Sequence, residues 1–250
     1  MDVTQLKLIQ SVFVFLALTL LFYIYRGLKI GLEISGYPEK RRKKILFIFL
    51  AAIIIWILTV SGLSIFKFFL DFQAMPPRLL YAFFIPLGFI LYFTFSSKLN
   101  KVLIATPVWP LIYIQAYRVV VEILRWVLML LKVVPVQMSF AGSNFDIIAG
   151  VTAPLIAYFC YQRKNWAYNV ALLWNFAGLV LLINRFIIGL LSMPTSFQIY
   201  HDGPAYTLTA YFPMIISPAV LVPIGYAMHM FSIKQILLKK KNAVQLTLAG

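Results

Sequence analysis

The chain has 250 residues, of which 62% are hydrophobic and only 12% are charged, and its mean hydropathy is +0.91. A soluble globular domain carries about 25% charged residues, so this composition excludes that class and indicates a polytopic membrane protein. The formal net charge of +15 would suggest nucleic acid as a partner if the protein were soluble. Most basic residues instead lie in short runs between apolar stretches, so we exclude nucleic acid and expect the lipid bilayer as the partner.

Seven apolar segments are long enough, or nearly so, to cross a bilayer as helices. The first of them has neither a basic n-region nor a small-residue cleavage site, so it predicts a helix rather than a signal peptide. We therefore expect an all-α membrane protein in which residues 1–250 form a single domain, one bundle of seven transmembrane helices. The expected helices are residues 8–25, 45–66, 79–95, 111–131, 145–161, 166–190 and 210–233.

The basic residues predict the orientation of this bundle. Fifteen of the 22 Lys and Arg lie in the segments that alternate helices place on one side, and four lie in those of the other side. Basic loops remain in the cytoplasm during insertion. The pattern predicts an N-terminus outside and a C-terminus in the cytoplasm.

Prolines divide or bend three of the expected helices. Residues 102–134 would form a helix of about 50 Å, which exceeds the hydrocarbon core of about 30 Å. Pro107 and Pro110 predict a division of this stretch, with residues 102–110 as an interfacial or re-entrant approach. Pro86 predicts a kink within residues 79–95. Three prolines at intervals of five, Pro213, Pro218 and Pro223, form either hinges or bends in the last helix.

One helix carries a polar stripe. At 100° per residue, Gln115, Arg118, Glu122, Arg125 and Lys132 fall within about one third of the helix circumference. The spacings of three and four residues let both arginines reach the one carboxylate. Each such charge costs about 2.5 to 3.5 kcal/mol at a helix centre, so Arg118, Glu122 and Arg125 must face the protein interior.

Five polar residues of other segments complete the candidate ligand-binding set. Ser143 with Asp146 is a capping-box pattern at a helix start, and Asp146 with Asn144 could alternatively line the outer mouth of a cavity. Asn175 lies at nearly the depth of Arg118 and is a candidate partner for it. The whole candidate set is Gln115, Arg118, Glu122, Arg125, Asn144, Asp146, Asn175, Arg185 and His229.

The same residues argue against a metal, cofactor or catalytic site. Cys160 is the single cysteine of the chain, so an intrachain disulfide and a multi-cysteine metal site are excluded. His229, at an aromatic and methionine-rich helix end, is read as an interfacial packing histidine rather than a heme or metal ligand. No phosphate-binding glycine loop, metalloprotease helix or nucleophile elbow occurs. We expect no cofactor, and the sequence does not set the oligomeric state.

The stripe leaves three functional hypotheses open. Arg118, Glu122 and Arg125 sum to +1, so either another acidic residue or a bound anion closes the balance. Asp146 is the acidic residue within reach, but it is expected near the membrane boundary, which favours a ligand. The first hypothesis is the binding or translocation of a small polar or anionic solute. The second is a sensor or assembly scaffold without transport, and the third is a membrane enzyme that acts on a lipid.

Four pieces of the C-terminal half carry a resemblance. They are RVVVE at Arg118, NFDI at Asn144, TAP at Thr152 and LVPIGYAMHMFSIKQ at Leu221. These pieces resemble stretches of a group of bacterial polytopic membrane proteins to which we attach no activity. The resemblance implies a location in the bacterial inner (plasma) membrane.

Overall fold

The computed structural model describes residues 3–164 and 166–249, and every regular element in these two ranges is helical. This confirms the expected all-helical class. Three-residue 3-10 turns and one π turn, Ser217–Leu221, join some of the helices. The helices are α1 (Val3–Ile34), α2 (Glu39–Ile65), α3 (Leu79–Phe95), α4 (Asn100–Ala105), α5 (Trp109–Tyr113), α6 (Tyr117–Leu130), α7 (Ile147–Tyr161), α8 (Ala167–Ser192) and α9 (Val222–Ala249).

Four helices are long and apolar enough to cross a membrane: Thr4–Ile34, Glu39–Ile65, Ala167–Ser192 and Ser217–Gln245. A fifth span results if α3 and the following residues Ser97–Ala105, bent by 69° from it, are counted together. α7 is apolar but shorter, and α6 carries charged residues. The chain is therefore compatible with an integral, multi-pass membrane protein.

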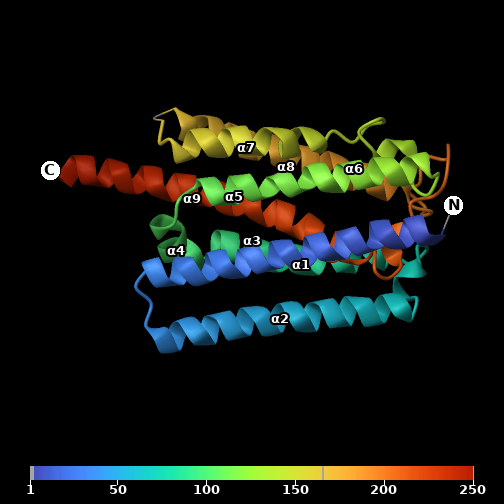
Figure 1. Cartoon of the computed structure of the whole chain (residues 1–250), viewed down its shortest axis with the longest axis horizontal. Helices are drawn as coiled ribbons and strands as arrows, with labels where there is room; N and C mark the ends of the chain where they lie inside the picture. The colour runs from blue at the N-terminus through green and yellow to red at the C-terminus, as the bar shows by residue number, and fades with distance from the viewer. Residues whose placement is uncertain (1–2, 165, 250) are drawn as a thin grey trace.

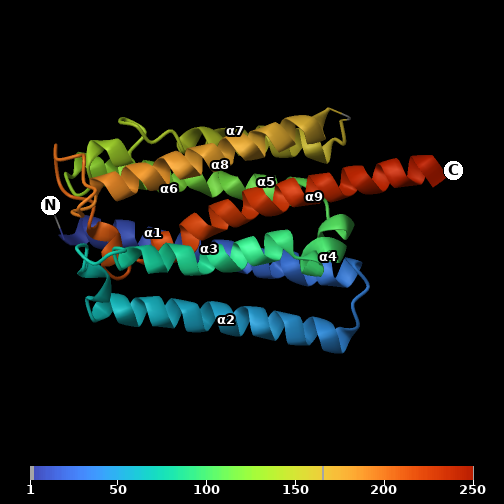
Figure 2. The same cartoon turned by 180° about the vertical axis from the view of Figure 1, so that it is seen from behind.

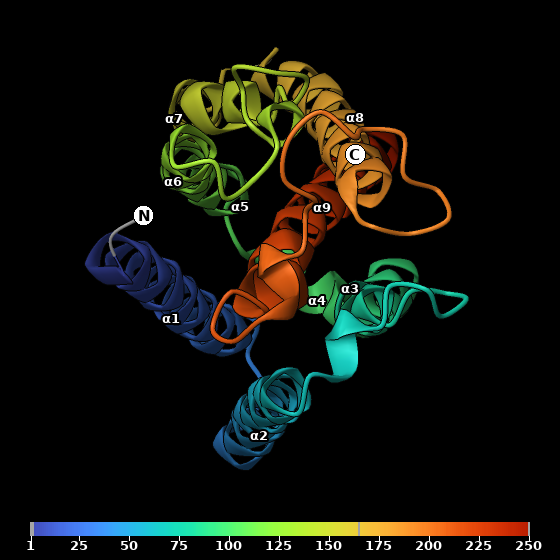
Figure 3. The same cartoon turned by 90° about the vertical axis from the view of Figure 1, so that its right-hand side faces the viewer.

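The long helices lie side by side along one axis, as Figures 1 and 2 show from opposite sides. α9 occupies the middle of the end view in Figure 3 and packs against α3, α4, α5 and α8. α2 lies at the edge and packs mainly against α1, with only 6% of its most apolar stretch buried. The interior of the protein is thus organised around α9.

The helix bounds differ from the expected ones at the polar flanks and at the prolines. The expected helix 111–131 is divided into α5, a 3-10 turn and α6, and the last helix continues to Ala249 rather than ending near 233. α3 has the expected range, while α1 and α2 extend beyond the apolar stretches into their polar flanks. The last helix was expected to begin at 210, but residues 211–215 form turns and regular helix starts with the π turn at Ser217. Pro213 and Pro218 explain this correction, because neither has the backbone N–H that a helical ladder needs.

Side chains of neighbouring segments donate hydrogen bonds to backbone carbonyl groups of the last helix near Pro223. Pro223 cannot donate to the carbonyl oxygen of Ala219, and the indole Nε1 of Trp56 donates to that oxygen at 3.0 Å instead. The amide of Gln115 also donates to the backbone of the same helix, to the carbonyl oxygen of Gly225 at 3.0 Å. Gln115, a candidate ligand-binding residue, therefore holds backbone in this structure.

The break between α3 and α5 is held by side chains of α9. Gln235 is fully buried, and its Nε2 lies 2.8 Å from the carbonyl oxygen of Leu103 and 3.0 Å from that of Thr106. The Lys239 ammonium donates to the carbonyl oxygen of Ile104 at 2.7 Å. Helix ends leave carbonyl groups without partners, and these donors satisfy them. Residues 102–110, expected as an interfacial or re-entrant approach, thus belong to α4, to the turn that follows it and to the start of α5, and hydrogen bonds join the turn to α9.

We expect Gln235→Ala to lower the free energy of unfolding by about 1 to 3 kcal/mol, because it leaves buried carbonyl groups without a donor. Leu237→Ala, at a half-exposed position of the same helix, serves as the control. Thermal unfolding of the purified protein in detergent measures both changes. Equal losses in the two variants would show that the contacts of Gln235 do not hold the break.

Candidate functional site

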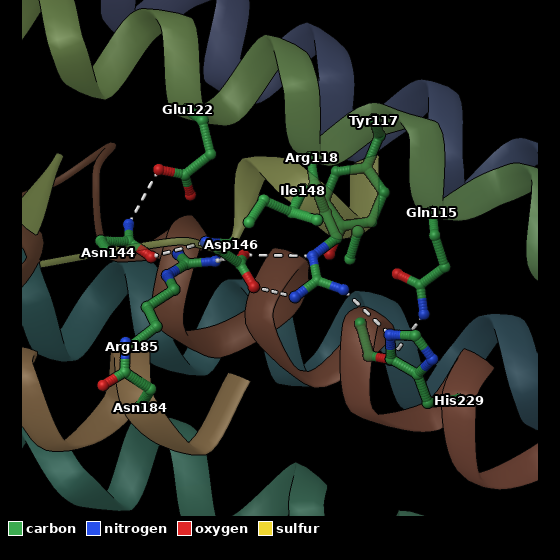
Figure 4. A network of polar contacts seen from close by, with 12 residues as sticks. Gln115, Tyr117, Arg118, Glu122, Asn144, Asp146, Ile148, Asn184, Arg185 and His229 are labelled. Atoms are coloured by element: carbon green, nitrogen blue, oxygen red, sulfur yellow. Dashed lines mark hydrogen bonds and ion pairs between the residues drawn. The ribbon is translucent and has the colours of Figure 1, made fainter. Parts of the chain in front are cut away.

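Five charged side chains are buried together in one half of the bundle, the half in which α6 ends at Leu130. Arg118, Glu122, Arg125, Asp146 and Arg185 each expose at most 5% of their surface. They come from α6, from the segment before α7, and from α8, and Figure 4 shows most of them converging. Asn144, Asn175 and His229 are buried beside them. The structure thus brings eight of the nine candidate residues into one network.

Arg118 is held by Asp146 and not by Glu122. Its Nε donates to Asp146 Oδ2 at 3.1 Å, and its Nη2 donates to Asp146 Oδ1, so the pair is bidentate (Figure 4). The expectation that both stripe arginines share Glu122 is therefore wrong for Arg118. Bidentate pairing of this kind is among the strongest ionic contacts available to an arginine.

Gly150 explains why Asp146 reaches α6. A Cβ atom added at Gly150 would lie 2.8 Å from the backbone nitrogen of Val119, a contact that no side chain could make. The glycine therefore allows α7 to approach the backbone of α6 directly. This approach brings the start of α7, and the carboxylate of Asp146 with it, against Arg118.

His229 continues the network toward the other end of the bundle. Arg118 Nη1 lies 2.9 Å from His229 Nε2, and His229 Nδ1 lies 2.9 Å from Asn175 Oδ1. A guanidinium can only donate, so Nε2 is the acceptor and the proton is on Nδ1, which donates to Asn175. The amide of Asn175 donates in turn to Ser232 Oγ at 3.0 Å. Asn175 therefore reaches Arg118 through His229 rather than directly.

The position of His229 corrects its interpretation as an interfacial packing residue. Its side chain is fully buried, between Trp174 and Gly178. A Cβ atom at Gly178 would lie 2.2 Å from the imidazole ring, so the absence of a side chain on α8 makes the space for this histidine. Sequence spacing alone does not reveal such a fit, because it depends on the packing of α8 against α9.

Glu122 has two other partners. Arg125, one helical turn further on, donates to Oε1, and Asn144 donates to Oε2 at 2.8 Å. The side-chain oxygen of Asn144 also accepts the backbone N–H of Asp146 at 3.2 Å. The expected capping box of Ser143 and Asp146 is therefore wrong, because Asn144 caps that N–H and the Asp146 carboxylate turns to the arginines.

The three buried arginines differ in how fully they are paired. Arg118 makes three side-chain hydrogen bonds, two to Asp146 and one to His229. In the described part of the chain, Arg185 makes one, from Nη1 to Asp146 Oδ2 at 3.2 Å, and Arg125 makes one, to Glu122. With His229 neutral, three arginines and two carboxylates leave a net charge of +1. In the structure Asp146 is the additional acidic residue of the network. Arg185 belongs to the network as well, so the net charge stays at +1.

Two small cavities adjoin the less fully paired arginines. A cavity of about 10 Å³ lies beside Arg125, and one of about 60 Å³ lies beside Arg185. A cavity volume of about 10 to 15 Å³ is enough for one water molecule, so the larger cavity has room for a small chemical group of a ligand. Tyr206, Thr209 and Ser217 line both cavities.

Thr209 is a polar residue that sequence reasoning missed. It exposes 4% of its surface, and its Oγ1 has no hydrogen-bond partner within the residues that the structure describes. Thr209 lies between the expected helices 166–190 and 210–233, in a connection where a hydroxyl would be solvated. The fold instead returns Thr209 to the interior, and neither hydropathy nor spacing signals this. A buried hydroxyl without a partner costs about 1 to 3 kcal/mol, so it indicates a partner that is supplied by a ligand or water.

Comparison of the chain with protein-family models, with curated proteins and with solved structures found no match. The resemblance to a group of bacterial membrane proteins therefore stays a prediction. No group of three His, Cys, Asp or Glu residues that could hold a metal ion occurs among residues 3–164 and 166–249.

We expect Arg118 to be energetically coupled to Asp146 and not to Glu122. Asp146→Asn leaves two buried arginines without a carboxylate and should lower the free energy of unfolding by about 3 to 5 kcal/mol. The double change Asp146→Asn with Arg118→Gln should lose clearly less than the sum of the single losses. Thermal unfolding measures this cycle, and the cycle of Glu122→Gln with Arg118→Gln is the control, expected to be additive. The opposite result in the two cycles would contradict the pairing described above.

Proposed function

We propose that the protein crosses a bacterial plasma membrane seven times, with its N-terminus outside and its C-terminus in the cytoplasm. The crossing segments would be α1, α2, α3, the continuous stretch from α5 to α6, α7, α8 and α9 with its π turn. Two arguments support this. Successive segments of this set run in opposite directions along the common axis (Figure 1), and the positively charged clusters, such as residues 40–44 and 239–241, fall at one end of it.

A second proposal concerns what the buried network does. We infer that the protein binds a small anionic or polar solute between Arg125 and Arg185. The carrying observation is that the network has a net charge of +1 while these two arginines, with one hydrogen bond each, adjoin cavities that share Thr209. A bound anion would neutralise the surplus charge and give Thr209 its missing partner. Binding is also the first step that translocation of such a solute would need.

The network would then have two parts with different roles. Arg118, Asp146 and His229 have mutually satisfied hydrogen bonds, which favours a structural role in joining α6, α7 and α9. This observation supports the alternative of a scaffold for that part alone. Glu122 would orient Arg125 through its ion pair, and Asp146 would orient Arg185. The solute charge would therefore be met by Arg125 and Arg185.

Reporter fusions test the topology. A reporter fused after Lys44 or after Lys241 should report the cytoplasm, because both positions follow positively charged clusters that remain inside. A reporter fused at Pro135, between α6 and α7, should report the outside. The reverse pattern at these positions would overturn the orientation.

Anion-dependent stability tests the binding site. In a buffer whose only anion is gluconate, added chloride, nitrate, acetate or phosphate should raise the thermal stability of the wild type, by about 2.7 kcal/mol at a hundredfold excess over the dissociation constant of the best anion. Arg185→Gln should keep its fold and lose this gain, because Asp146 retains Arg118. Lys7→Gln removes one exposed positive charge and should keep the gain. If none of these anions raises the thermal stability, the binding proposal is overturned and the scaffold hypothesis remains.

A further inference from the structure

The walls of the larger cavity are mostly apolar, which is unusual for a site that binds an anion. It lies between α3, α8 and the π turn before α9, and its lining is mostly apolar, with Leu79, Phe83, Phe186, Leu190 and Val222 among the residues. Its polar groups are those of Arg185 and of the three residues that it shares with the smaller cavity. A small hydrated anion gains nothing from apolar walls, whereas an apolar chain does.

The rim of this cavity faces the apolar surface of the bundle. Leu80, Phe186 and Leu190, which belong to its lining, are partly exposed. Beyond them, the outer faces of α3 and α8 present large apolar side chains such as Phe84 and Ile187, each almost half exposed. In a bilayer these faces contact acyl chains. Partly exposed residues of α3 and α8 thus place one edge of the cavity at the apolar surface of the bundle.

Positive charge and an orphan hydroxyl lie at the inner side of the same cavity. Arg185 is 5% exposed and has a single hydrogen bond, to Asp146, so its remaining donors have no partner in the described part of the chain. Thr209 Oγ1 is likewise buried and without a partner. Both groups line this one cavity, so a carboxylate or phosphate in it is the partner that each of them lacks, and one such anion cancels the net +1 of the network.

We propose that the ligand is a single-chain anionic amphiphile, a carboxylate or phosphate lipid that enters from the bilayer between α3 and α8. Its headgroup binds Arg185 and Thr209, and the first methylene groups of its chain fill the apolar part of the cavity. This inference rests on the proposed anion site and names its ligand class. A free anion from water is the competing source, and it would use the same arginine without the apolar walls.

Photolabelling in phosphatidylcholine vesicles tests the inference with the whole protein. The probe is a twelve-carbon carboxylate that carries a diazirine near its headgroup, and the labelled residues are mapped by peptide mass spectrometry. We expect labels on α3 and α8 around the cavity. Dodecanoate should displace the probe, while acetate and the uncharged dodecanol at equal concentration should not. The chain matters because each buried methylene strengthens binding by roughly fourfold.

Three variants separate headgroup from chain. Arg185→Gln should reduce labelling by about tenfold, since a charge-assisted hydrogen bond is lost. Gly189→Leu adds a side chain inside the cavity and should abolish labelling while the Arg185 residue itself is unchanged. Gly189→Ala is its matched control and should still label, because the added Cβ atom lies 3.7 Å or more from its neighbours. Thermal unfolding of each variant shows that its fold is retained.

The outcomes distinguish this inference from the proposed anion site. Displacement by acetate as effective as that by dodecanoate would overturn the lipid ligand and support a small-anion site. Displacement by dodecanol as effective as that by dodecanoate, or full labelling of Arg185→Gln, would overturn recognition of the headgroup. Absence of label on α3 and α8 overturns the lipid inference, while the anion-stability measurement decides the proposed function independently.

Discussion

The carboxylate of Asp146 is the contact on which the interior of this protein depends. It accepts hydrogen bonds from Arg118 of α6 and Arg185 of α8, and it lies at the start of α7, so one side chain joins three helices. Buried charges carry a large desolvation penalty, which pairing offsets only when the geometry is good. The bidentate contact with Arg118 meets that condition. Arg185, with one longer hydrogen bond, is left with capacity for another partner.

Small residues and prolines decide where the charged groups can lie. Gly150 lets α7 reach the backbone of α6, and Gly178 makes room for the imidazole of His229. Pro218 and Pro223 interrupt the ladder of the last helix, and Trp56 of α2 and Gln115 satisfy carbonyl groups around that interruption. The polar residues of the interior thus do two different things: some complete the backbone of α9, and others form the ionic network that the amphiphile would approach.

Part of this arrangement was predictable from local spacing. Glu122 and Arg125 are three residues apart on a helix, and the structure has this ion pair. The equally good spacing of Arg118 and Glu122 predicted a contact that the structure does not make. A carboxylate on another helix offers Arg118 two parallel hydrogen bonds, and spacing within one helix carries no information about such a competitor. Thr209 was missed for a related reason, because a residue between helices gives no periodic signal of burial.

The sequence by itself determined the helical class, most helix positions and the burial of Arg118, Glu122 and Arg125, while Lys132 of the same stripe is exposed. These properties are local: apolar length, proline positions and the cost of a charge in an apolar segment can be read along the chain. The tertiary structure alone decided which acid holds Arg118, which nitrogen of His229 carries the proton, and that Arg185 and Thr209 line one cavity. These outcomes depend on how far the helices approach and how they are rotated, and close contacts at glycines such as Gly150 and Gly178 set both.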